Sequence, residues 1–202
     1  MPIRTLPDLE SALDHLRAAP PDAGTLSLVV RRPERLTREL LEEAVVDEAD
    51  GVVGDNWLSR ATSRAKAGGR HLDAQVTVMS SRMIELLGDT DDERALAGDQ
   101  LYVDLDLSHD NLPAGTRIQV GDDVVLEVTA KPHAGCKKFL ARFGQDAVAF
   151  VNSDEGRRLR LRGLNARVVH GGVVRVGDDV RRLPFSMAPS DVSGRSQTHP
   201  PG

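Results

Sequence analysis

Aromatic residues are scarce in this chain, at 3% of 202 residues. A core with few rings has to be built from Val, Leu, Ile and Ala, and β-branched side chains of this kind favour strands. The shortage also argues against a protein that stacks nucleobases on aromatic side chains. Lys and Arg number 26 against 31 Asp and Glu, which gives a net charge of −5 at pH 7. We therefore expect no nucleic-acid partner.

Cysteine and long apolar runs are equally rare. The single cysteine, Cys136, has no partner for an internal disulfide. The N-terminal residues Met1-Pro2-Ile3-Arg4 do not open an apolar signal segment, and no apolar run is long enough to cross a bilayer. These absences predict a protein of the reducing cytoplasm with no membrane partner.

The N-terminal region has a helical pattern. Leu6, Leu9, Leu13 and Leu16 recur at helical spacing before Pro20-Pro21, which predicts a helical appendage over residues 1–22, packed outside the main domain. Further along we expect a strand at 24–30, a charged helix at 36–44, an exposed basic loop at 60–70, a strand at 75–79, a helix at 82–87 and an acidic connector at 89–93. Residues 186–202 are rich in Pro, Ser and Gly and predict a disordered tail.

From Leu101 onward apolar residues alternate with polar ones. Residues 101–107, 116–120 and 124–130 each have the period of a strand. The pentapeptide VGDDV occurs at 120–124 and again at 176–180, and we expect both copies, like Gly171-Gly172, to form hairpin turns. The predicted fold class is mostly β with a few short helices: a small closed or nearly closed β-barrel over residues 23–185.

Cys136 stands directly before a short helix with an apolar face, which we expect Gly144 to end. The N-terminus of a helix favours negative charge, and Lys137 and Lys138 add positive charge beside the thiol. Both effects favour the thiolate, the form needed for nucleophilic attack, sulfur transfer and soft-metal ligation. The alternative is an inert cysteine that only packs in the core.

Other candidate groups carry weaker signals. His133 lies three residues before Cys136 and could share a metal with it, but a structural zinc site needs four ligands. Residues 157–162 alternate Arg with apolar residues like a strand with one cationic face, which Arg167 extends; this face either binds an anion or is simply solvated. We expect the acidic group to form the solvated face of a strand without a functional role; its members are Asp99, Asp104, Asp106, His109 and Asp110.

The order of several segments resembles the MOSC domain family, found at the C-terminus of molybdenum cofactor sulfurases and in stand-alone bacterial proteins. The segments are Gly51–Asp55, 75–88, 112–129, the Cys136 segment and 162–180, within a resemblance that spans about residues 24–182. It implies a β-barrel whose single cysteine, here Cys136, carries sulfur as a persulfide or binds the molybdenum of a pterin cofactor. The implied cofactor-binding residues are Lys137, Arg162, Arg167, His133 and Lys138.

Two activities follow from the resemblance. One is persulfide carriage in the assembly of a metal–sulfur centre or of the molybdenum cofactor. The other is molybdenum–pterin ligation for the reduction of N-hydroxylated small molecules. No segment resembles the pyridoxal-phosphate domain of complete sulfurases, so the first activity needs a sulfur donor such as a cysteine desulfurase, and the second a redox partner. A non-catalytic barrel that binds an anionic metabolite is the alternative from another class.

Overall fold

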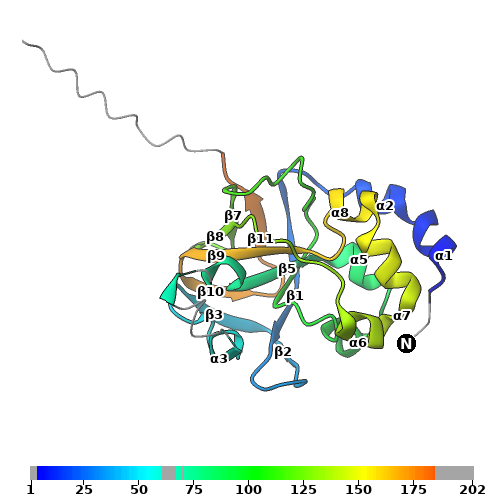
Figure 1. Cartoon of the computed structure of the whole chain (residues 1–202). Coiled ribbons are helices and arrows are strands. Elements are labelled where there is room, and N and C mark those ends of the chain that lie inside the picture. Colours follow the sequence, from blue (N-terminus) through cyan, green and yellow to red (C-terminus); the bar gives the residue numbers. More distant parts are fainter. Residues whose placement is uncertain (1–3, 61–66, 70, 185–202) are drawn as a thin grey trace, which may run out of the picture.

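A computed structural model describes residues 4–60, 67–69 and 71–184 of the chain (Figure 1). The strands are β1 (Ala23–Arg31), β2 (Glu39–Leu41), β3 (Glu43–Asp47), β4 (Gly51–Val52), β5 (Val76–Ser80), β6 (Leu101–Val103), β7 (Arg117–Val120), β8 (Val124–Val128), β9 (Leu164–His170), β10 (Gly172–Arg175) and β11 (Asp179–Arg182). The helices are α1 (Leu6–Ser11), α2 (Leu13–Arg17), α3 (Trp57–Arg60), η1 (Leu72–Ala74), α5 (Ser81–Glu85), α6 (Asp91–Ala95), α7 (Lys137–Asn152) and α8 (Asp154–Arg158).

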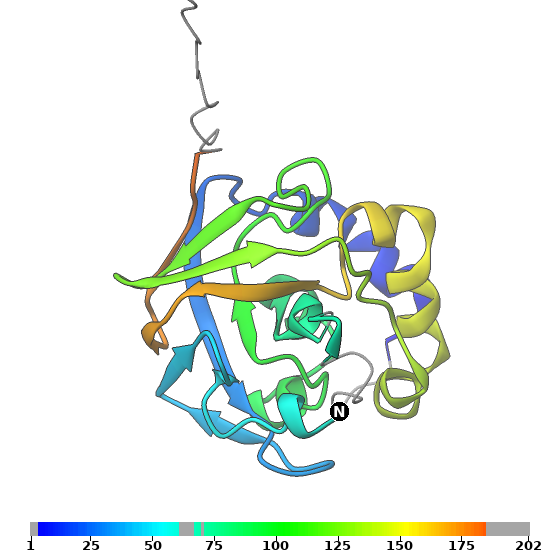
Figure 2. The ribbon, with the colours of Figure 1, turned by 60° about the vertical axis from the view of Figure 1, so that its left-hand side comes forward.

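Seven strands close into a barrel, which confirms the predicted fold class (Figure 2). The order around the barrel is β11-β7-β8-β9-β5-β6-β1, and β1 pairs with β11 to complete the ring, with Gly24 opposite Val180. Within the ring only β5 and β6 run parallel. Strand β2 extends the sheet beyond β1, and β10, β3 and β4 form a separate small sheet. Closure leaves the barrel itself without a free edge.

Two apolar cores lie on opposite faces of the barrel wall. Alternation along β5 turns Val76 and Val78 toward the barrel interior and Met79 toward the outer face. The outer core packs that face against Leu9 of α1 and several residues of α7, so the N-terminal helices belong to a helical layer on one side of the barrel (Figure 1). The position between Val76 and Val78, Thr77, therefore also points outward, toward the site described below.

Several sequence-based expectations of secondary structure are wrong, including the acidic connector at 89–93, of which residues 91–93 begin α6. Residues 36–44 were expected to be helical but contain β2, which pairs with β1, and the start of β3. The Gly171-Gly172 and second VGDDV turns do not make hairpins, because β10 pairs with β3 while β11 pairs with β7 and β1. Only the first VGDDV joins paired strands, β7 and β8. In the cases that involve strands, strand pairing overrides the local signal.

Gly144 has a more important role than ending a helix. Its φ of 88° and ψ of 175° break α7 into two helical halves, a conformation that is strained for residues with a Cβ. A straight helix of 16 residues would separate its ends by about 24 Å. The break instead turns the second half back, so that Asn152 at its end contacts Gly135, just before its start. The predicted tail, residues 186–202, lies outside the described residues.

Candidate functional site: a cationic cleft around Cys136

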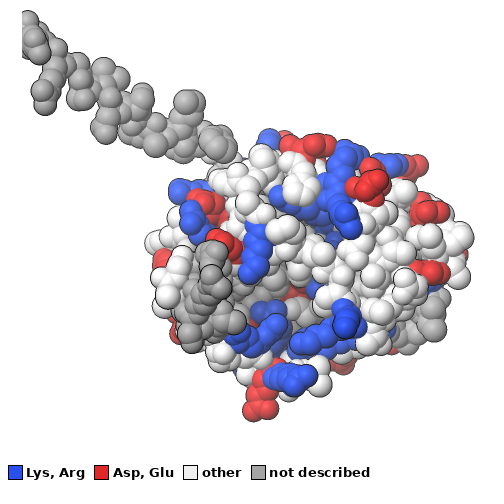
Figure 3. All heavy atoms as spheres, viewed as in Figure 1, with Lys and Arg blue, Asp and Glu red and all other residues white. Residues whose placement is uncertain are grey.

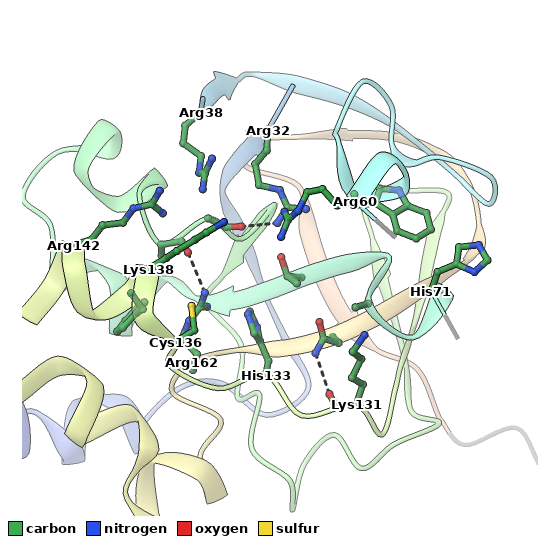
Figure 4. A pocket seen from close by; sticks show the side chains of 17 residues that line it. Arg32, Arg38, Arg60, His71, Lys131, His133, Cys136, Lys138, Arg142 and Arg162 are labelled. Atoms are coloured by element: carbon green, nitrogen blue, oxygen red, sulfur yellow. Dashed lines mark hydrogen bonds between the residues drawn. The ribbon is translucent and has the colours of Figure 1, made fainter. Parts of the chain in front are cut away.

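A cleft of about 500 Å³ opens on the outer face of the barrel, between β5, β9, the segment after β8 and the first half of α7 (Figure 4). Its charged and imidazole side chains are Arg32, Arg38, Arg60, His71, Lys131, His133, Lys138, Arg142 and Arg162. The remaining lining residues are Trp57, Ala74, Thr77, Ala97, Gly98, Cys136, Phe139 and Asn165. Among the described residues that line the cleft there is no Asp or Glu, so the site is built for negative charge.

Cys136 is the N-cap of α7 and is exposed to solvent. Partial burial acts to raise the pKa of its thiol, but the peptide N–H groups of Phe139 and Lys138, together with the charges of Arg162 and Lys138, lower this pKa below its ordinary value. The predicted environment is therefore present: a reachable sulfur at a helix N-terminus among cations.

The end of α7 holds the loop before Cys136 in place. The Asn152 side chain accepts a hydrogen bond from the Gly135 N–H at 3.0 Å and donates one to the Gly135 carbonyl at 3.2 Å. Asn165 of β9 donates to the carbonyls of Lys131 and Pro132 at 3.1 and 3.2 Å. These two amides fix both ends of the 131–135 segment, and with it the position of the sulfur.

Two arginines of the cleft, Arg32 and Arg162, are buried and paired with buried carboxylates; we call them the paired arginines. Arg32 makes a two-pronged contact with Asp55, at 2.8 and 2.9 Å, and donates to the Gly98 carbonyl. Arg162 donates to Asp99 at 2.5 Å and to the Ala97 carbonyl at 3.0 Å, and its guanidinium lies 4.9 Å from the centre of the Phe139 ring. Both carboxylate side chains have no exposed surface. Such pairs belong to the folded framework, because either charge alone would be costly to bury.

The other cations have no ion-pair partner among the described residues; the unpaired cations are Arg38, Arg60, Lys131, Lys138 and Arg142. Arg38 donates to its neighbour's carbonyl, and its buried Nε has no acceptor in the described part of the chain. Burial and then the charges of Arg142 and Arg32 lower the Arg38 pKa, while burial and then Arg60 lower that of Lys138. Lys and Arg side chains gather around this hollow in the surface view (Figure 3). The mutual repulsion favours binding of an anion.

His133 lies between the cleft and the buried carboxylate of Asp99. Its Nδ1 is 3.4 Å from Asp99 Oδ1, but neither atom makes a hydrogen bond within the described chain. Burial lowers the pKa of His133 to about 4, against the pull of Asp99 and with help from Arg162 and Arg32. The imidazole is therefore neutral at pH 7.

The structure brings four of the predicted site residues together: Cys136, His133, Lys138 and Arg162 all line the cleft. The other two lie elsewhere. Lys137 is exposed and does not line the cleft, and Arg167 lies half-exposed on β9, where it donates to Glu127 at 2.5 Å. Lys137 was expected beside the thiol because it is the next residue in the chain, and Arg167 because of the family resemblance, but helix and strand geometry turn both away from the cleft.

Two further interpretations need correction. Residues 157–162 are not a strand with one cationic face but the end of α8 and the turn after it, so their arginines point to different environments. Asp99 is not a solvated strand residue. It is fully buried as the partner of Arg162.

Five residues of the cleft were not predicted from sequence patterns: Arg32, Arg38, Arg60, Arg142 and His71. Arg60 falls in the basic stretch 60–70 interpreted as an exposed loop, of which residues 61–66 and 70 lie outside the described residues. Arg32 and Arg38 each lie next to a strand, and Arg142 lies on a helix, and nothing in the local sequence marks them. No described group of three or more His, Cys, Asp or Glu side chains is arranged to hold a metal.

Comparison with known proteins agrees with this architecture. No curated protein sequence matches the chain. Three similar solved structures are the YUAD protein from Bacillus subtilis, YiiM from Geobacillus stearothermophilus and YiiM from Escherichia coli. The Bacillus protein has a TM-score of 0.54 and 16% identity, over 81% of this chain and 97% of that one. The Geobacillus protein has a TM-score of 0.53 and 14% identity, over 80% and 75%. The Escherichia coli protein has a TM-score of 0.50 and 15% identity, over 81% and 72%.

These structures share the fold of this chain, and at sequence identities of 14–16% they indicate the fold alone. In the described part of the chain, no helix combines the length and the apolar character that crossing a bilayer requires. The family itself is given by the sequence model of the MOSC domain, which matches residues 68–181 and so includes Cys136, His133, Lys138, Arg162 and most of the barrel. With more than half of its residues matched by that model, the chain belongs to the MOSC domain family.

Proposed function

We propose that the cleft binds a molybdenum–pterin cofactor, with Cys136 as the protein ligand of the metal. The observation that carries this proposal is the combination of a thiolate-favouring cysteine with five unpaired cations in one cleft. A thiolate is a soft ligand of the kind that such metals accept. The phosphate of such a cofactor is bound favourably by cations and repelled by carboxylates, which matches the described lining.

The residues present fit such a cofactor. The buried Nε of Arg38 has no acceptor in the described chain, and phosphate oxygens would supply one. Arg38 and Arg142 lie on the same side of the cleft as Lys138, opposite His71 and Lys131 (Figure 4). We assign the phosphate to the first three and the metal to Cys136. The flat stacked pair of Trp57 and His71, with ring centres 5.5 Å apart, bounds the other end of the cleft.

Side chains around the cleft would position the cofactor and its cysteine ligand. Asn152 and Asn165 orient the loop that carries Cys136, and the paired arginines keep the cleft wall rigid. His133 stays neutral at pH 7 and so does not add to the positive charge beside the sulfur. When bound, the cofactor supplies two-electron chemistry at its metal, suited to the reduction of a small N-hydroxylated molecule with electrons from a separate redox protein.

Persulfide carriage is the second candidate, because Cys136 is exposed and its pKa is lowered. In this reaction the thiolate attacks the outer sulfur of a donor persulfide. A new S–S bond forms on Cys136 as the donor's S–S bond breaks, and the donor sulfur leaves as a thiolate, so no external oxidant or reductant is needed. A cysteine desulfurase or another persulfide-bearing protein would be the donor.

The test is purification of the chain without oxygen from a host that makes the molybdenum cofactor, followed by elemental analysis and fluorescence of the released pterin. We expect molybdenum and pterin in equal amounts in the unmodified protein, a loss of both in Cys136→Ser, and no loss in Arg175→Gln, an exposed arginine of β10. Protein free of both, carrying one added sulfur atom on Cys136 by mass spectrometry, would replace the first proposal with persulfide carriage. Protein free of all three would contradict both.

A further inference from the structure

A second cavity, of about 660 Å³, lies along the 129–134 segment, next to the Cys136 cleft. It shares His133, Arg162 and Lys131 with the cleft, but Cys136 does not line it. We propose that this cavity is a binding site for a small organic carboxylate with an apolar body, anchored by Arg160. The proposal goes beyond the cofactor assigned to the cleft and does not depend on it.

Arg160 is the main argument. Its side chain is buried, with a relative exposure of 8%, yet it has no carboxylate partner among the described residues. Nη1 donates to the backbone carbonyls of Leu112, at 2.6 Å, and Leu107, at 3.3 Å. Nε and Nη2 have no acceptor within the described chain. These two nitrogens form the guanidinium edge that binds both oxygens of a carboxylate.

Arg160 differs from the two paired arginines in having no carboxylate partner among the described residues. Arg32 and Arg162 are buried to the same degree as Arg160, and each has a buried carboxylate within 2.8 Å. A buried guanidinium without such a partner is costly to the fold. Arg160 also has a φ of 50°, in the left-handed region that residues with a Cβ rarely adopt. Burial and backbone strain are thus two energetic costs at Arg160, and a bound anion would offset the first.

The rest of the lining indicates the kind of anion. Exposed Lys131 and Arg157 add positive charge, and no Asp or Glu lines the cavity in the described part of the chain. Most other walls are apolar, including those made by Pro113, Ala130 and Pro132. Phosphate groups favour polar sites with many donors, whereas this cavity offers one buried guanidinium edge, two exposed cations and a large apolar surface. That combination suits a single carboxylate on a hydrocarbon or aromatic body.

The experiment titrates the full chain with benzoate, hexanoate and cinnamate by isothermal calorimetry, beside the matching amides and inorganic phosphate. We expect at least one carboxylate to bind and its amide to bind at least tenfold more weakly. Arg160→Gln should weaken carboxylate binding about tenfold or more. Ala130→Phe, which adds a ring at a residue that lines the cavity, should do the same and keeps the test valid if Arg160→Gln fails to fold.

Two variants serve as controls. Cys136→Ser removes the centre of the first cleft, and Arg175→Gln removes a surface arginine; both should bind the carboxylate like the unmodified chain. The proposal is overturned if no carboxylate binds, if phosphate or the amides bind equally well, or if binding survives in both Ala130→Phe and a folded Arg160→Gln. Loss of molybdenum binding in Cys136→Ser, with carboxylate binding intact, would separate this site from the function proposed for the cleft.

Discussion

The paired arginines and the unpaired cations share one cleft but differ in what stabilises them. Arg32 and Arg162 each lie against a fully buried carboxylate, and their charges are neutralised within the fold. Arg38, Lys138 and Arg142 lie near one another without such partners in the described chain, and the pKa values of Arg38 and Lys138 are lowered by burial and by the other cations. The first group builds the wall of the cleft, while the second keeps charge available to a ligand at some cost to stability.

The largest effect expected from this difference is on stability. Asp99→Ala leaves Arg162 buried without its carboxylate, and we expect the free energy of unfolding to fall by about 3 to 5 kcal/mol. Urea denaturation would measure it. The matched control is Glu43→Ala, whose exposed pair with Arg175 should contribute less than about 1 kcal/mol. Equal losses in the two variants would show that the buried pair has no special structural role.

The next effect is the pH dependence due to His133. In the unfolded chain this residue titrates near 6.5, and in the fold near 4 because of burial. Between these values the unfolded chain binds a proton that the folded chain does not, so stability decreases as the pH falls from 6.5 to 4. His133→Gln removes this contribution. Relative to the unmodified protein, the variant should gain up to about 3 kcal/mol across that range.

The measurement for His133 is the difference between the two proteins' unfolding free energies at several pH values. The other titrating groups are common to both proteins and largely cancel in that difference. If the difference in unfolding free energy between the two proteins is the same at pH 6.5 and at pH 4, the imidazole is protonated in the fold, as a partner of Asp99.

The unpaired cations should show the opposite behaviour: a large effect on binding and little on stability. Trp57, the only tryptophan, lines the cleft, so its fluorescence reports binding of pyrophosphate as a probe of the phosphate site. Replacing Arg38 and Arg142 together with Gln should weaken that binding about tenfold or more. Stability should stay within about 0.5 kcal/mol or rise. A double variant that is strongly destabilised yet binds pyrophosphate normally would show that Arg38 and Arg142 stabilise the fold and do not bind the ligand.

The smallest effect concerns the thiol. Lys138→Gln removes one of the charges that lower the Cys136 pKa, and should therefore raise this pKa. The rate of iodoacetamide labelling against pH would measure the change. Lys137→Gln is the control: its residue is next to Cys136 in the chain but lies outside the cleft, and should leave the profile unchanged. A larger shift for Lys137 than for Lys138 would contradict the geometry.

Much of the fold could be predicted from local patterns. The alternation in β7 and β8 follows the burial observed, and the helix after Cys136 begins where its apolar face and flanking residues indicate. These features depend on residues that are neighbours in sequence, so the periodicity of apolar side chains is enough to find them. The ends of strands and the pairing of β10 with β3 were not predictable in this way, because they depend on partners far along the chain.

The cleft itself was only half predictable. Cys136, Lys138 and His133 lie within six residues of one another, and local sequence identified them together. Arg32, Arg38, Arg60 and Arg142 are distributed over more than a hundred residues, and nothing in their immediate surroundings distinguishes them from surface arginines. Asp99 was assigned to a solvated face for the same reason: its role depends on Arg162, which is far away in sequence.

By itself, the sequence determined the class of fold, the family and the position of a cysteine at the start of a helix, since these follow from short-range patterns and ordered motifs. Only the tertiary structure decided which cations surround that cysteine and which of them are neutralised. Barrel closure brings the segments after β1, before β6 and after α8 beside α7, and the break at Gly144 turns Asn152 back onto the loop before the thiol. Charge acts through space, and the distances that set its effect exist only once the chain has folded.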